Sequence, residues 1–176
     1  MRTLRPHFLA VLIALAFALA AVQPSTAASS RAVEPETYLV KRIRHYRATT
    51  VQLRSMMGKP TTLRRVGRVS IRRAHKIWRH RAVITRKRFL QGPAHKGAWL
   101  CIHRYEGAWS DGGSPYYGGL QMDISFQASY GGKLLATKGT AGNWTPLEQM
   151  WVAEHAYRSG RGFYPWPNTA RYCGLI

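Results

Sequence analysis

Glu106 is the residue of this chain with the clearest setting for acid–base chemistry. The apolar residues around it recur at steps of three and four, which predicts the inward face of a short helix: Ala98, Trp99, Ile102, Tyr105 and Trp109. Glu106 follows Ile102 by four positions, so we expect it on that face, and Gly107 then lets the chain turn out. A carboxyl group on an apolar face loses hydration, which favours its protonated form, and a protonated carboxyl group can donate a proton to a leaving oxygen. The alternative is a glutamate that ends the helix and points to water.

An unusual string, Tyr116-Tyr117-Gly118-Gly119-Leu120-Gln121, follows the loop at residues 111–115. Adjacent aromatic rings offer flat faces of the kind on which sugar rings stack. Adjacent glycines let a backbone approach a ligand or a helix closely, and a glutamine presents donors and an acceptor to hydroxyl and acetamido groups. The alternative is a structural hairpin turn with both tyrosines in the core.

These residues together resemble the catalytic domain of resuscitation-promoting factors, which belong to the transglycosylase-like, lysozyme-like group. The resemblance covers roughly residues 97–176 and continues through Phe126, Gly131-Gly132, Leu147-Glu148-Gln149, Ala153-Glu154, Trp166-Pro167 and Cys173. It implies that Glu106 is the catalytic acid and that Gln121 lies in the substrate cleft. In that family the cysteine stands directly before the glutamate, whereas Cys101 comes five positions earlier here.

We therefore expect residues 95–176 to form a small, mainly helical, lysozyme-like domain with little sheet. Asp123 is predicted to cap a helix over residues 124–130 that Gly131-Gly132 stop. Thr145-Pro146-Leu147-Glu148 has the pattern of a capping box with proline at the first helical position, so Glu148 is interpreted as a cap residue rather than a catalyst. That helix should run to about Arg158, and the proline-rich residues 163–167 should not be helical.

Residues 1–28 have the pattern of a secretory signal peptide. Arg2 and Arg5 precede an uncharged apolar run at residues 8–22, and small residues predict cleavage after Ala27 or Ala28. This run is shorter than the ~20 residues that cross a bilayer, which argues against an uncleaved membrane anchor. We expect a secreted, cell-wall-associated protein.

The two cysteines of the chain, Cys101 and Cys173, are therefore expected to form one disulfide that ties the Glu106 helix to the C-terminus. Two free, buried thiols are the alternative. The histidines and cysteines show no metal-ligand spacing, so neither a metal nor a cofactor is expected.

The middle of the chain, residues 29–94, is a basic helical region or linker. Residues 31–94 hold 18 Lys and Arg against only Glu34 and Glu36, whereas residues 95–176 hold seven against five acids. Helical spacing predicts basic, amphipathic helices over about residues 35–57 and 70–89, which could pair as an antiparallel hairpin. Such a region suits anionic cell-wall polymers or a membrane surface. A solvated linker is the alternative, and nucleic acid is not expected as the partner of an exported chain without a nucleic-acid module.

The function that we predict is cleavage of the β-1,4 glycan strands of peptidoglycan by a lytic transglycosylase or a muramidase-like hydrolase. Glu106 would act as general acid and base, and Trp109, Tyr117 and Gln121 would hold sugar rings. A two-carboxylate scheme would need a partner acid, for which Asp111 and Asp123 are the nearest in sequence. The alternatives are a non-catalytic glycan-binding protein of the cell wall and a basic protein that adheres to wall or membrane.

Overall fold

The computed structural model describes residues 27–176, with side chains described from Thr37 onward. The predicted signal peptide thus lies almost entirely outside the described residues. Within residues 27–176 the fold is mainly helical and has no β-strand, the nearest feature being one isolated antiparallel bridge between Tyr117 and Met122. No described helix is long and apolar enough to span a membrane.

Two long helices, α1 (Ala27–Met56) and α2 (Ile71–Gln91), make up the basic region. The hydroxyl of Ser70 accepts a hydrogen bond from the Arg73 N–H and so caps α2. Gly58 and Gly92, both at positive φ, follow the ends of these two helices. We call α1 and α2 together the basic helix pair.

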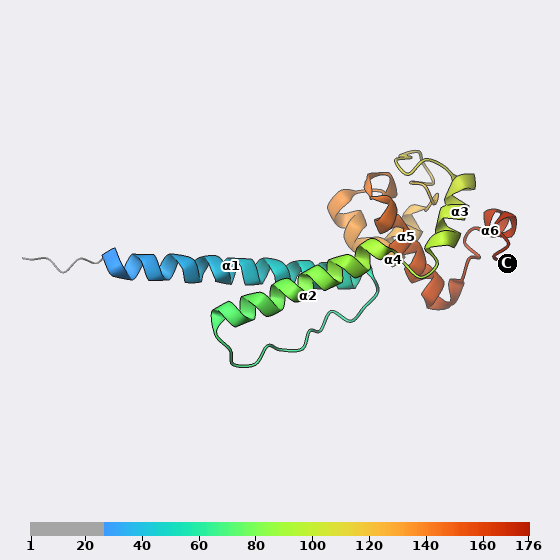
Figure 1. Cartoon of the computed structure of the whole chain (residues 1–176). Coiled ribbons are helices and arrows are strands. Elements are labelled where there is room, and N and C mark those ends of the chain that lie inside the picture. The colour runs from blue at the N-terminus through green and yellow to red at the C-terminus, as the bar shows by residue number, and fades with distance from the viewer. Residues whose placement is uncertain (1–26) are drawn as a thin grey trace, which may run out of the picture.

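The basic helix pair runs parallel, so the antiparallel hairpin that we considered is wrong. Residues that contact each other across the pair have a nearly constant separation in sequence, as in parallel helices. The rings of Tyr46 and His75 lie 5.6 Å apart, and the Arg47 guanidinium lies 5.9 Å from the Trp78 ring. The extended segment at residues 57–70 returns along the pair before α2 begins (Figure 1). Fourteen extended residues span roughly 45 Å and α2 is about 31 Å long, so the connection is long enough to permit this topology.

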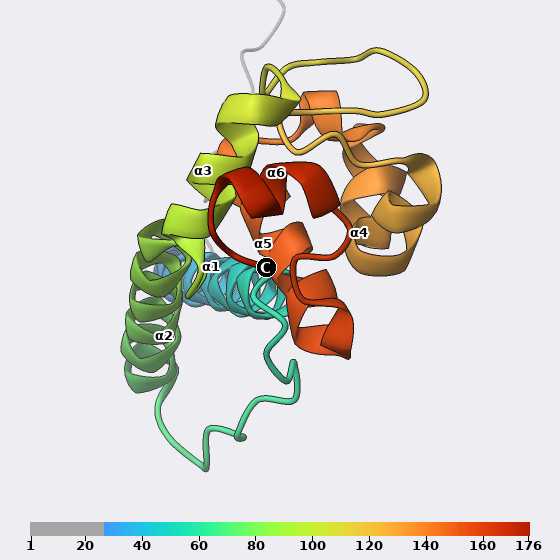
Figure 2. The same cartoon turned by 90° about the vertical axis from the view of Figure 1, so that its right-hand side faces the viewer.

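The C-terminal unit, residues 95–176, is built around α5 (Pro146–Ala156), which is buried on nearly every side. Around α5 lie α3 (Lys96–Glu106), α4 (Ile124–Lys138) and α6 (Pro167–Tyr172) (Figure 2). Trp99 and Ile102 of α3 are fully buried against this core, as predicted. Tyr105, which we expected on the same face, is exposed and packs its ring on Tyr172 instead.

The predicted capping signals are confirmed, but several helix boundaries differ from the expectation, including those of α4 and α5. Asp123 caps α4, and Thr145 and Glu148 form the capping box of α5. However, α4 continues to Lys138, because Gly131 takes a non-helical conformation (φ −130°, ψ 20°) that kinks the helix without ending it. Regular α5 ends at Ala156 and continues as a π-helical turn, Tyr157–Arg161.

The basic helix pair docks on the C-terminal unit through a second buried cluster. Met57, Phe89 and Trp151 pack together there, with the rings of Phe89 and Trp151 stacked 6.1 Å apart. The Trp151 indole N–H donates to the Phe89 carbonyl (3.2 Å), and the Arg158 guanidinium donates to the Met57 carbonyl (3.3 Å). These contacts bury one side of Trp151, so α1 and α2 complete the packing around α5.

Candidate active site

Glu106 is the last residue of α3, and its side chain is half-buried. The hydroxyl of Thr169 in α6 donates a hydrogen bond of 2.8 Å to Oε1 of Glu106. Thr169 is itself buried. The carboxyl group is therefore held in place from a different helix, through a neutral donor.

The predicted disulfide between Cys101 and Cys173 is confirmed, with the two Cα atoms 6.0 Å apart. It joins the same two helices that the Thr169–Glu106 hydrogen bond joins. Thr169 precedes Cys173 by four residues, about one helical turn, and Glu106 follows Cys101 by five. The disulfide and the hydrogen bond thus hold α6 against the C-terminal half of α3 at two points.

The other four acids of the C-terminal unit are each held by N–H groups or a cation. Asp123 accepts from the Phe126 N–H (2.7 Å), and Asp111 accepts from the Gly113 N–H (2.9 Å). Glu148 binds the Lys138 ammonium at 2.7 Å and the Thr145 N–H at 2.8 Å. Glu154 accepts from the Trp99 indole N–H (3.0 Å). Among the described carboxyl groups, Glu106 differs in having a single neutral hydroxyl as its hydrogen-bond partner.

Glu154 lies fully buried at the centre of a polar network that positions α3. Its carboxylate accepts from the Trp99 indole (3.0 Å) and the Arg158 guanidinium (3.0 Å), and contacts Nδ1 of His95 at 3.1 Å. Burial acts to raise the pKa of Glu154. The hydrogen bonds from Trp99 and His95, with the charges of His95 and Arg158, outweigh burial and hold this pKa below its usual value.

Gln121 lies beside the Glu106–Gly107 end of α3. A Cβ added to Gly107 would stand 3.0 Å from Nε2 of Gln121, so the Gln121 side chain packs closely on Gly107. The Gln121 amide donates to Oδ2 of Asp111 (2.8 Å) and to the Gly118 carbonyl (2.9 Å). The pKa of Asp111 lies below its usual value, mainly because of the hydrogen bond from the Gly113 N–H. The hydrogen bond from the Gln121 amide lowers this pKa further.

Trp109 and Tyr117 lie in the same loop, but no hydrogen bond or ring contact joins either to Glu106 in the described part of the chain. The Trp109 indole stacks on His103 with centroids 3.9 Å apart, and both Trp109 and Tyr117 are half-buried against the core. Tyr117 pairs its backbone with Met122 around the tight turn, while Tyr116 is exposed. The alternative of a structural hairpin turn is therefore confirmed as far as the turn is concerned. It is wrong for Tyr116, which does not lie in the core. The sugar-binding roles of Trp109, Tyr117 and Gln121 stay predictions.

Gln149 holds this loop from α5, a role that sequence reasoning missed. Its side-chain oxygen accepts from the Gly119 N–H (2.8 Å), and its amide donates to the carbonyls of Trp109 (2.8 Å) and Ala141 (2.9 Å). A Cβ on Gly118 would stand 2.5 Å from Oε1 of Gln149. The paired glycines therefore serve the approach of the loop to α5 and α3.

The role of Thr169 was also not predicted from the sequence, although its spacing from Cys173 could have indicated it. Its spacing of four from Cys173 places both on one face of a helix, so pairing Cys173 with Cys101 brings Thr169 to the Glu106 end of α3. The proline-rich composition of residues 163–167 argued against a helix here. Pro167 is instead the first residue of α6, a position where proline is favourable.

Within the described residues, no group of three or more His, Cys, Asp and Glu side chains could hold a metal ion. No family model, no curated protein and no solved structure matches this chain.

Proposed function

We propose that residues 95–176 form a lysozyme-like domain of the resuscitation-promoting-factor type, which cleaves the β-1,4 glycan strands of peptidoglycan outside the cell. The observation that carries this proposal is the setting of Glu106. It is the described side-chain carboxyl group that neither a cation nor an N–H group holds, and Thr169 and the disulfide fix the helix end on which it stands. A general acid needs such a fixed carboxyl group that is not committed to an ion pair.

In the proposed reaction, Glu106 donates its proton to the glycosidic oxygen as the bond from that oxygen to C1 breaks. The resulting Glu106 carboxylate then takes the proton of the 6-hydroxyl of the same sugar, whose oxygen bonds to C1. This gives a 1,6-anhydro product and returns Glu106 to its protonated form, so one carboxyl group suffices. Asp111 and Asp123 are poor candidates for a second catalytic carboxylate, because N–H groups hold both, with pKa values below the usual range.

Glycan binding by Trp109, Tyr117 and Gln121 belongs to the same proposal. Gln121 lies against Gly107, and its amide is oriented by Asp111, so it is held close to the residue that follows Glu106. The exposed Tyr116 adds an aromatic face to the same loop.

We further propose that the basic helix pair retains the protein on anionic cell-wall polymers or the membrane surface. No acid lies between Glu36 and Glu106, so residues 37–91, which hold all of α2 and most of α1, carry only positively charged side chains. Docking through Met57, Phe89 and Trp151 holds this surface against the C-terminal unit. A flexible linker would not hold it in this way.

Digestion of purified peptidoglycan, followed by mass spectrometry of the soluble fragments, tests the proposal. A lytic transglycosylase releases fragments with anhydro ends, and a muramidase releases fragments with reducing ends. The non-catalytic alternatives, a glycan-binding or an adhesive protein, release neither, and either of them would be favoured if the protein binds the wall without producing fragments.

A further inference from the structure

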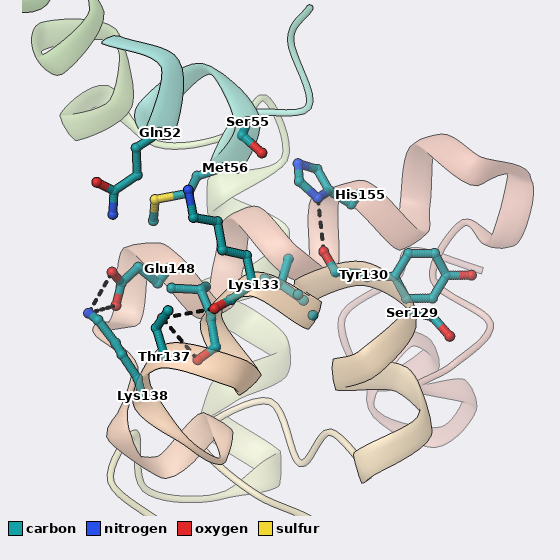
Figure 3. Close-up of a pocket in the computed structure, with 14 residues that line it drawn as sticks. Gln52, Ser55, Met56, Ser129, Tyr130, Lys133, Thr137, Lys138, Glu148 and His155 are labelled. Atoms are coloured by element: carbon teal, nitrogen blue, oxygen red, sulfur yellow. Dashed lines mark hydrogen bonds and ion pairs between the residues drawn. The ribbon is translucent and has the colours of Figure 1, made fainter. Parts of the chain in front are cut away.

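A cavity of about 700 Å³ lies between α1, α4 and α5, lined by elements other than those that surround Glu106 (Figure 3). Gln52, Ser55 and Met56 line it from α1, residues 129–134 from α4, and Val152 and His155 from α5. Its size is within the range of 300–1,000 Å³ that is typical of small-ligand pockets. It exists only because α1 docks beside the C-terminal unit.

The two adjacent glycines of α4 shape this cavity. A Cβ on Gly131 would stand 2.8 Å from the Trp144 ring and 2.9 Å from Val152, so Gly131 lets α4 pack closely on the core. A Cβ on Gly132 would meet nothing within 4 Å. Gly132 is exposed and lines the cavity, so a larger side chain would meet no obstacle at this position.

The charge of the lining is unbalanced. Lys138 pairs with Glu148 at 2.7 Å, and Glu148 is the one carboxylate among the lining residues. Lys133 extends from α4 across the cavity towards α1 and makes no ion pair with any described residue (Figure 3). One uncompensated ammonium group suits a ligand with a single negative charge.

The other unused groups of the lining suit a peptide. The side chains of Gln52 and Ser55 make no hydrogen bond within residues 37–176. The backbone carbonyl of Tyr130 can only accept, so Nδ1 of His155 donates to it (3.1 Å), whereas Nε2 of His155 is buried beside Gly58 and is not accessible to a ligand. Met56, which is half-buried, adds apolar surface for small aliphatic side chains.

We propose that this cavity binds a short peptide with a free carboxylate. Resting on the proposed function, we assign it to the stem peptide that peptidoglycan carries on its glycan strand. The carboxylate pairs with Lys133, the peptide amides bond to Gln52 and Ser55, and the alanine-sized side chains of the peptide lie against Met56. Cleavage is then favoured on strands that still carry their peptides.

Calorimetric titration of the full chain with the free stem tetrapeptide tests this inference. We expect binding, with affinity about five- to tenfold lower for the peptide whose carboxylates are amidated, because an ionic hydrogen bond is lost. Lys133→Met should cause a similar loss, whereas Lys76→Met, on the exposed face of α2, should not. Gly132→Leu, which fills the open space, should also weaken binding.

Absence of tetrapeptide binding, or unchanged affinity in both Lys133→Met and Gly132→Leu, overturns the inference. Tighter binding of glycerol phosphate than of the tetrapeptide at Lys133 overturns the peptide as its ligand. The result is separable from glycan cleavage: lysis without tetrapeptide binding contradicts only the cavity, and tetrapeptide binding without lysis contradicts only the proposed enzyme.

Discussion

At the scale of single residues, the setting of Glu106 depends on Thr169. The Thr169 hydroxyl is the one group observed to hold the Glu106 carboxyl, and it comes from the helix that Cys173 joins to α3. Thr169 acts through Glu106, so it is a positioning residue.

Thr169→Val removes the hydrogen bond while keeping the side-chain volume, and we expect kcat for wall lysis to fall by about two- to tenfold with KM unchanged. This range corresponds to the loss of one hydrogen bond of roughly 0.5–1.5 kcal/mol. Thr169→Ser should restore most of kcat, and Thr61→Val, in the exposed connection between α1 and α2, is the matched control. Equal activity of the valine and serine variants would remove Thr169 from the mechanism.

Glu154 should make the stability of the protein depend on pH. Its pKa in the folded state lies below the usual value of 4.5, so its ion pairs stabilise the fold above that pH and are lost as the pH falls through the folded-state pKa. Glu154→Gln should therefore lower the free energy of unfolding by roughly 1–3 kcal/mol at pH 7 and by less in acid. Urea denaturation at pH 7 and pH 3 measures both differences, and a constant difference would contradict this role.

At the scale of elements, the loop at residues 107–122 is held by close approach rather than by regular structure. A Cβ on Gly119 would stand 2.6 Å from Nδ1 of His103 and 2.7 Å from the Trp109 ring, whereas a Cβ on Gly112 would meet nothing within 4 Å. The two glycines thus form a matched pair for mutagenesis.

Gly119→Ala should destabilise the fold by roughly 1–3 kcal/mol, because His103 and Trp109 must move to admit the methyl group. It should also reduce lysis, since the same loop carries Gln121. Gly112→Ala should change neither property. Thermal unfolding of both variants provides the measurement, and equal midpoints would show that the close approach is not required.

Several elements could be predicted from the sequence because their signals are local. Ser70, Asp123 and Thr145 start helices through their own side chains, and Gly58 and Gly92 follow helix ends through positive φ. The parallel pairing of α1 and α2 could not be predicted, because it depends on the packing of Met57 and Phe89 on Trp151, far along the chain.

The candidate site was predictable only in part, for the same reason. Glu106 stood out from its own neighbours in sequence. Its contact with Thr169 spans 63 residues and depends on tertiary packing. Similarly, Gly131 reads as a helix stop in isolation, yet contacts with Trp144 and Val152 stabilise α4 through the kink.

At the scale of the whole molecule, the basic helix pair and the C-terminal unit share buried surface. Removing α1 and α2 would expose Phe89's partner Trp151 and eliminate the α1 wall of the cavity. Charge substitutions in the full chain therefore test the basic surface more cleanly than truncation does.

Replacing Arg72, Arg79 and Arg86 by glutamine should weaken retention on purified cell wall at low salt. These exposed residues recur every seven positions on α2, so they lie along one side of the helix. The same triple replacement by lysine keeps the charge and should bind like the wild type. At high salt, where surface charges are screened, the glutamine variant and the wild type should be retained on the wall to the same extent. An electrostatic role would be contradicted if binding to the wall did not depend on salt and the glutamine variant bound as well as the wild type.

The most direct test of the proposed function is lysis of purified peptidoglycan by Glu106→Gln, followed as a fall in turbidity. Glutamine keeps the shape and can still accept from Thr169, but it has no proton to transfer to the glycosidic oxygen. We expect a folded protein that binds glycan strands and has lost about 10²–10⁴-fold in rate. Asp111→Asn and Asp123→Asn should cost much less. Wild-type lysis by Glu106→Gln, or loss of lysis in Asp123→Asn without unfolding, would contradict Glu106 as the acid.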